Sequence, residues 1–353
     1  MSLDSLPWKI IFETLKPEPD IAELIRLAAE GLNEEELLTI CSDHGILLIV
    51  NESLKGVIQQ IFTVIGLEKW RSAVAASTLH SLEMNRELQR LISLFNKTDL
   101  RAVPFKGPML SESLYGDPLL RMSADLDLMV PRDHVDRAVD LLIEDGYLAE
   151  FDREDLQRWL KPNTRFFHCS LVHENRKWLL EIHWSLFAGW RKAHFPQPTG
   201  AECFPGGVGD TIETLLYLCN HGARHWWIEL KWVIDVEHCV RSVHDLDWEE
   251  LFTRAGDRGC LRVVYMSLLL AQRVCGLEVP GVFNAAICKD SKAAELVCRV
   301  SQNWRLAKSQ WPSLSWKMRY LLDCRERWSD KLGMIIDYPI LRSLPTFGGK
   351  QNH

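Results

Sequence analysis

The chain has 353 residues, of which 47% are hydrophobic and 25% are charged, and its formal net charge at pH 7 is -7. This composition is that of a globular protein and excludes long disordered tracts, while the acidic balance argues against long nucleic acid as a partner. The longest apolar run, at residues 45–50, is far shorter than the roughly 20 residues of a membrane helix, so no membrane contact is expected.

The cysteines and the N-terminus indicate a reducing compartment. Ten cysteines are scattered along the chain without a C-x-x-C pair, so they are expected to be small buried side chains. The first residues lack the basic stretch and apolar segment of a signal peptide, and we expect a cytoplasmic protein. The fourteen tryptophans are interpreted as packing anchors, with ligand stacking as the alternative.

Residues 1–98 show helical patterns throughout. Apolar residues recur at helical spacing over residues 21–28, after a Pro-Asp pair that can begin a helix. Asn33 is followed by three glutamates, which favour the first turn of a helix. A long amphipathic pattern then covers residues 67–95. Nothing in this region suggests chemistry, and we expect a helical lid or scaffold.

Strand and helix patterns alternate between residues 99 and 200, which predicts a small α/β sheet domain. The predicted strands cover residues 102–105, 125–130, 147–151, 165–172 and 178–184, and the predicted helices cover residues 109–115 and 132–144. Residues 196–207 are rich in Pro and Gly and predict a linker. Residues 210–213 have the spacing of a capping box and open a helical domain at residues 208–345. The expected fold class is therefore α+β, with a small mixed-sheet core at residues 99–200 flanked by helical regions.

Asp125 and Asp127 are the sharpest chemical feature of the chain. Side chains at i and i+2 of a strand point to the same face, so the two carboxylates project together. Their mutual repulsion is relieved by a divalent cation, and Mg²⁺ prefers carboxylates together with substrate phosphates. The alternative is an exposed strand face with two solvated acids.

The residues before this pair could hold a phosphate. Lys106 and Gly107 lie between a predicted strand and a predicted helix, where bare backbone N–H groups suit an anion. Gly107 lets the backbone approach closely, and Lys106 adds a point charge. Arg121 lies four residues before Asp125 and could contact a phosphate or support the acids. Each of these residues alone is equally typical of a protein surface.

A later strand supplies a third acid. Glu181 and His183 share one face of this strand, and its flanking residues are apolar. Burying an acid there is costly without a metal or a partner, so Glu181 is predicted to complete a metal site, with an edge-strand salt bridge as the alternative. His183 is interpreted as a hydrogen-bonded neighbour in preference to a metal ligand.

A helical segment carries a further group of polar residues. If residues 221–235 form one helix, His221 and His225 have the i,i+4 spacing that can bind a metal, although no Glu follows His221 as in the zincins. We prefer a polar stripe that faces the sheet domain. In that interpretation Arg224, His225 and Lys231 would contact the triphosphate or the acceptor.

Together these segments resemble an uncharacterised bacterial nucleotidyltransferase family of the DNA polymerase β-like nucleotidyltransferase superfamily. The resemblance covers roughly residues 100–280 and rests on KGP at 106–108, LYGDP at 114–118, RMSADLDLMV at 121–130, LEIHW at 180–184 and HGARHWWIELKWVIDV at 221–236. Pro108 stands where the superfamily's pattern has Gly or Ser, so Ser111, Ser113 or Lys106 would have to take over that contact.

The resemblance implies transfer of a nucleoside monophosphate from a nucleoside triphosphate, with ATP expected, to a small-molecule, sugar or peptide acceptor in a biosynthetic pathway. It implies Mg²⁺ or Mn²⁺ as cofactor, held by three catalytic acids, Asp125, Asp127 and Glu181. The expected nucleotide-binding residues are Lys106, Gly107, Arg121, His183, His225 and Lys231. Two alternatives stay open: a nucleotide- or partner-binding module of this fold without catalysis, and a toxin-like enzyme that modifies tRNA or a protein.

Overall fold

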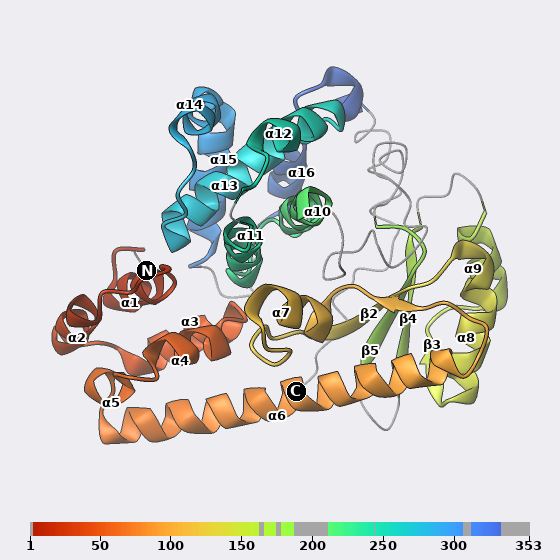
Figure 1. Cartoon of the computed structure of the whole chain (residues 1–353), viewed down its shortest axis with the longest axis horizontal. Helices are drawn as coiled ribbons and strands as arrows, with labels where there is room; N and C mark the ends of the chain where they lie inside the picture. The colour runs from red at the N-terminus through yellow and green to blue at the C-terminus, as the bar shows by residue number, and fades with distance from the viewer. Residues whose placement is uncertain are drawn as a thin grey trace.

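A computed structural model describes residues 3–161, 166–173, 178–186, 211–243, 245–305 and 312–332. The predicted linker at 196–207 and the start of the predicted capping box at residue 210 lie outside these ranges, as does Arg165. Within them, a small mixed sheet is flanked by helices that precede it and helices that follow it (Figure 1). The expected α+β fold class is confirmed.

The N-terminal helices end in one very long helix. They are α1 (Leu6–Thr14), α2 (Ile21–Ala29), α3 (Glu34–Asp43), α4 (Leu47–Leu54), α5 (Ile58–Ile61) and α6 (Val64–Asn96). The side chains of Asp20 and Asn33 cap α2 and α3 as the sequence predicts. Helix α6 extends from α5 to the sheet (Figure 1). It therefore forms a common support for the helical part and the sheet part.

The sheet has the strand order β1-β2-β5-β4-β3. Its strands are β1 (Val103–Pro104), β2 (Asp125–Met129), β3 (Tyr147–Ala149), β4 (His168–His173) and β5 (Leu179–His183). Strands β2 and β5 are parallel, whereas the other neighbours are antiparallel. All five predicted strands are confirmed with shorter or shifted ends, and the parallel pair of central strands was not predicted.

Three short helices connect these strands. They are α7 (Gly107–Tyr115), α8 (Val135–Glu144), which follows the single turn η1 (Arg132–His134), and α9 (Arg153–Trp159). Helix α7 begins two residues earlier than predicted, at Gly107 itself. Helix α9 was not predicted; the side chain of Asp152 caps it.

The two faces of the sheet differ in character. Alternate residues such as Leu126, Leu128, Leu180 and Ile182 pack with α6 and α8 in one apolar cluster and are fully buried. The other alternate positions carry Asp125 and Asp127 on β2 and Glu181 and His183 on β5. The alternation of apolar and polar residues along β2 and β5 is therefore what separates a core face from a polar face.

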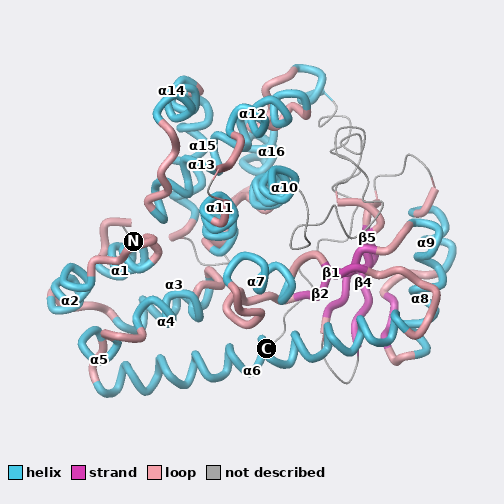
Figure 2. Tube along the Cα trace, in the orientation of Figure 1, coloured by secondary structure: helices cyan, strands magenta, loops and turns pink. Residues whose placement is uncertain are grey.

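The C-terminal helices share a second, larger core with the N-terminal helices. They are α10 (Thr211–Arg224), α11 (Lys231–Arg241), α12 (Trp248–Asp257), α13 (Leu261–Cys275), α14 (Gly281–Lys289), α15 (Ser291–Asn303) and α16 (Leu314–Asp323). Trp8 of α1 stacks with Trp304 after α15, and both side chains belong to this core. Figure 2 shows the strands gathered at one side of a largely helical molecule. Among the described residues, no helix is both long enough and apolar enough to cross a bilayer.

Residues 221–235 do not form one helix, so that expectation was wrong. Helix α10 ends at Arg224 and α11 begins at Lys231. Between them, Trp226 and Trp227 have φ values of 56° and 54°, which bulky residues seldom adopt. The Trp227 ring packs onto Gly222, where a Cβ would lie 2.4 Å from the ring. The turn therefore depends on a tryptophan ring that needs the bare glycine backbone beside it.

Candidate active site

Three carboxylates meet on the polar face of the sheet. Strands β2 and β5 pair in parallel with Asp127 opposite Glu181, and Asp125 shares the face of Asp127. One oxygen from each of these three acids lies within 4.8 Å of the others. The structure thus brings together the three acids that the sequence proposed as one site.

Asp127 is the centre of the charge arrangement. Its Oδ1 accepts hydrogen bonds from Lys106 Nζ at 2.6 Å and from His183 Nε2 at 2.9 Å. Burial opposes the ionisation of Asp127, but Lys106 and His183 outweigh burial and lower the pKa of its carboxyl group. The other oxygen, Oδ2, is buried without a hydrogen-bond partner. Asp127 is therefore a charged carboxylate whose Oδ2 oxygen is available to bind a ligand.

The two other acids differ in their protonation. Burial and the neighbouring Asp127 raise the pKa of Asp125 to about 6, and the charges of Lys106 and Lys231 offset this rise only in part. Burial would also raise the pKa of Glu181, but a hydrogen bond with His183 and the nearby His168 lower it instead. At neutral pH all three acids are therefore charged, and Asp125 is the one whose charge is least compensated.

The turn before α7 lies beside these acids. Gly107 has φ +58°, and a Cβ there would lie 3.7 Å from the backbone oxygen of Asp125. Lys106 is the N-cap residue of α7 and its side chain makes no capping hydrogen bond. Because Pro108 has no N–H group, Gly107 and Met109 carry the first backbone donors of the helix. An anion at this helix start would find both backbone donors and the nearby Lys106 ammonium group.

The serines expected to replace the missing hydroxyl at position 108 have different surroundings. Ser111 is fully buried; its Oγ donates to the Asp117 carbonyl at 2.6 Å and accepts from the Arg121 N–H at 2.9 Å. It therefore holds the loop before β2 in place. Ser113 is exposed on α7.

Arg121 is bound by Asp235 of α11. Its Nε lies 2.9 Å from both carboxylate oxygens, and the Tyr115 hydroxyl donates to Oδ1 of the same acid at 2.9 Å. Arg121 is only 5% exposed and Asp235 is fully buried. In this structure the Arg121 guanidinium group thus joins the loop before β2 to the C-terminal helices, and its predicted contact with a phosphate stays a prediction.

The predicted residues of the helical side lie at the turn between α10 and α11. The His225 ring is 4.6 Å from that of His221 and 5.1 Å from that of Trp232. Burial, with the nearby charge of Arg224, lowers the pKa of His225 to about 3, so this ring is neutral at pH 7. Lys231 Nζ pairs with Glu229 at 2.6 Å. Its charge also offsets a small part of the rise in the pKa of Asp125. Lys231, at the start of α11, therefore acts electrostatically on Asp125 of β2.

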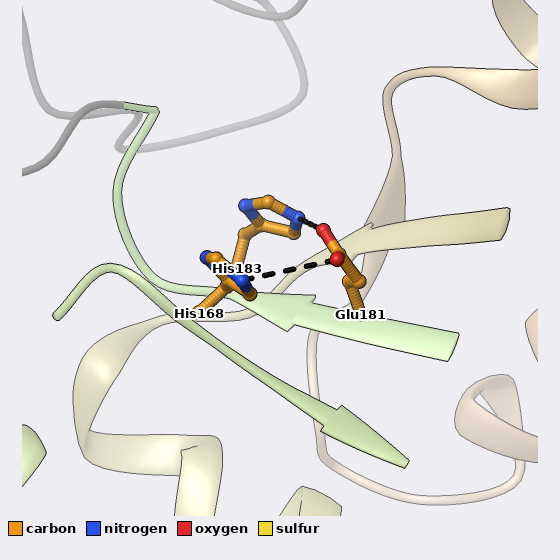
Figure 3. Close-up of side chains that lie close together, drawn as sticks. All are labelled: His168, Glu181 and His183. Carbon is orange, nitrogen blue, oxygen red and sulfur yellow. Dashed lines mark hydrogen bonds and ion pairs between the residues drawn. The ribbon is translucent and has the colours of Figure 1, made fainter. Parts of the chain in front are cut away.

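His168 was missed from the sequence. It lies directly opposite His183 in the register of β4 and β5, and the two stacked imidazoles lie on the same side of the Glu181 carboxylate (Figure 3). Its Nε2 is 3.8 Å from Glu181 Oε1. The alternation along residues 168–171 indicates which residues of this strand share a face. Only the strand register shows that His168 lies opposite His183.

The donor set suits a hard divalent cation. Carboxylate oxygens are the ligands that Mg²⁺ prefers, and Asp127 Oδ2 is a buried oxygen without a hydrogen-bond partner. A cation there would also relieve the repulsion that raises the pKa of Asp125. The residues that are present therefore fit the cofactor expected from the sequence.

A small mixed sheet with three converging acids beside a glycine turn defines the nucleotidyltransferase class of proteins. The model of the family described as "uncharacterised nucleotidyltransferase" matches residues 30–276, and the chain belongs to this family. Comparison with curated proteins and with solved structures found no match. The family match begins within the N-terminal helices, well before residue 100, so α3 to α6 are part of the family's common architecture.

Proposed function

We propose that this protein is a Mg²⁺-dependent nucleotidyltransferase that moves a nucleoside monophosphate from a nucleoside triphosphate, ATP in the first instance, to a small-molecule, sugar or peptide acceptor. The observation that carries the proposal is the convergence of Asp125, Asp127 and Glu181, with Asp127 Oδ2 buried and without a hydrogen-bond partner. Three carboxylates confined in this way cost stability unless a cation joins them.

Each residue has a separate role in this proposal. Asp125 and Asp127 hold the cation, which when bound neutralises charge on the transferred phosphoryl group. Lys106 and the α7 start at Gly107 bind the remaining phosphates, because they combine a positive charge with uncapped N–H groups. Glu181 is charged, because His183 and His168 lower its pKa, and it completes the carboxylate group on the acceptor side.

The helical side orients the acceptor. Arg224 of α10 lies over the Phe167 ring at 4.4 Å, and the charge of Glu181 acts on both Arg224 and His225. These residues are therefore near enough to the acids to contact a substrate bound there. The net charge of -7 disfavours a long polyanionic acceptor, which is why a small acceptor is preferred.

Calorimetry of ATP binding, with and without Mg²⁺, tests the site. We expect Mg²⁺-dependent binding by the wild type, and at least a tenfold loss of affinity in a folded Asp125→Asn/Asp127→Asn variant, which corresponds to about 1.4 kcal/mol or more. Asp133→Asn is the matched control, because Asp133 is an exposed acid shortly after β2. It should bind as the wild type does.

The outcomes separate the two candidate functions. A well-folded wild type that binds none of the common nucleoside triphosphates would overturn the proposal. Mg²⁺-dependent binding without pyrophosphate release in the presence of sugars, amines and peptides would favour the binding module that lacks catalysis. Pyrophosphate release that depends on one acceptor class and on Asp127 would establish the enzyme and name its substrate.

A further inference from the structure

Two histidines and one acid form a second cluster on the polar face of the sheet. The antiparallel register pairs His168 of β4 with His183 of β5, and Glu181 precedes His183 by two residues on the same strand. All three side chains therefore point to one face. Their positions are set by backbone hydrogen bonds between neighbouring strands and not by a loop.

The side chains are close enough to share a ligand. Glu181 Oε2 is 3.0 Å from His183 Nε2, and Glu181 Oε1 is 3.8 Å from His168 Nε2 (Figure 3). The two imidazole rings are stacked with centroids 4.9 Å apart. One ligand atom from each residue lies within 4.8 Å of the others, and both histidines are less than 10% exposed. The cluster is a set of two buried imidazoles and one partly buried carboxylate. An ion bound at His183 Nε2 would replace the proton that this nitrogen donates to Asp127 and Glu181.

We propose that His168, Glu181 and His183 form a second metal site, which takes a borderline transition ion such as Zn²⁺ and lies beside the carboxylate site for Mg²⁺. Two imidazoles and one carboxylate are a donor set for zinc and for Fe²⁺. Mg²⁺ prefers oxygen donors alone. The two neighbouring sites thus differ in the class of ion that each selects.

Glu181 joins the two sites. Its Oε2 faces His183 and its Oε1 faces His168, while an oxygen of the same residue also belongs to the group with Asp125 and Asp127. The second site rests on the proposed function only through this shared acid. An ion held by the histidines would lie on the Glu181 side, where the acceptor is proposed to bind, and would supply Lewis-acid chemistry there.

The test uses Co²⁺ as a spectroscopic probe for Zn²⁺. The full-length protein is freed of metal with a chelator and titrated with Co²⁺ in the presence of excess Mg²⁺, and the visible absorption of bound Co²⁺ is recorded. We expect one Co²⁺ per chain in the wild type that Mg²⁺ does not displace. His168→Gln should lower the Co²⁺ affinity at least about tenfold, since altering even an outer partner of a metal ligand costs that much.

His173→Gln is the matched control for this variant. His173 lies on the same strand and is equally buried, but it falls on the opposite face of the sheet, where it contacts Tyr147. This variant should bind Co²⁺ like the wild type. Equal losses in the two variants would point to a general disturbance of β4 and would overturn the assignment, as would a wild type whose Co²⁺ is fully displaced by Mg²⁺.

Two further measurements keep the outcome clear. If His168→Gln does not fold, proton NMR of the Co²⁺-loaded wild type replaces it: two paramagnetically shifted, exchangeable imidazole N–H signals are expected, and their absence overturns the site.

In Asp125→Asn, retained Co²⁺ binding with lost Mg²⁺-dependent ATP binding supports two separate sites. A wild type that binds Co²⁺ as expected but never binds a nucleotide would leave the histidine site standing and the proposed function overturned.

Discussion

The two faces of the sheet are made by the same strands yet meet opposite physical demands. On one face, Leu126, Leu128, Leu180 and Ile182 are fully buried against α6 and α8, and each stabilises the fold by leaving water. On the other face, charged and imidazole groups are buried at comparable depth, where each costs free energy unless a partner compensates it.

The compensation on the polar face is uneven, and this difference is informative. On this face Asp127 has Lys106 and His183, and beside the face Arg121 of the loop before β2 and Asp235 of α11 neutralise each other. Among the residues that the structure describes, no ion pair to Asp125 is found, and burial with the neighbouring Asp127 raises its pKa to about 6. Structural charges are thus paired within the chain, whereas the uncompensated charge lies where a cation is proposed to bind.

The largest expected effect comes from breaking the compensated pair. Asp235→Asn leaves the Arg121 guanidinium buried without its counter-charge, and we expect a loss of about 3–5 kcal/mol in the free energy of unfolding. Chemical denaturation measures this loss. Asp99→Asn is the control, because its pair with Arg137 is exposed, and its stability should hardly change. A small effect of Asp235→Asn would show that the interior between the loop before β2 and α11 tolerates an unpaired charge.

On the apolar face, Leu180→Ala is expected to lower the free energy of unfolding by about 2–5 kcal/mol, since it removes a buried side chain and leaves a cavity. Leu180 is 0% exposed, whereas Leu148 on β3 is 53% exposed. The same substitution at Leu148 should change stability by only about 0.5 kcal/mol or less. Equal losses at both positions, in urea denaturation curves, would contradict the assignment of the two faces.

The smallest predicted effect has the opposite sign. Asp125→Asn, measured by denaturation in a chelator, should stabilise the metal-free protein by on the order of 1 kcal/mol at neutral pH, because it removes a carboxylate that is costly to ionise. The folded-state pKa of about 6 exceeds the ordinary value, so ionisation costs the wild type stability as pH rises through this range.

The gain of Asp125→Asn should therefore be full above about pH 6 and vanish below about pH 4, where Asp125 is protonated in both the folded and the unfolded wild type. A gain independent of pH, or a loss of stability, would show that the Asp125 charge is compensated after all. The comparison between the two faces would then need another explanation.

The sequence by itself determined much of the sheet and the members of the acidic site. Alternation along residues 125–129 and 179–183 predicted both strands, and it assigned Asp125, Asp127 and Glu181 to polar faces because side chains of a strand alternate. The order of strand and helix patterns predicted the fold class, which the structure confirms. The resemblance of the motifs predicted the family, which the match over residues 30–276 confirms. The assumption of one continuous helix failed at Trp226 and Trp227, which have a left-handed backbone, because the Trp227 ring packs back onto Gly222.

Only the tertiary structure decided which residues meet. Periodicity tells which face a side chain occupies but not which strand lies beside it. The sequence grouped the three acids, but neither the parallel register that pairs Asp127 with Glu181 nor the pairing of His168 with His183 was predicted. The same holds for Arg121 and Asp235, which are 114 residues apart in the chain. Such long-range contacts follow from the packing of whole elements, and that packing converts a pattern of charges into a site.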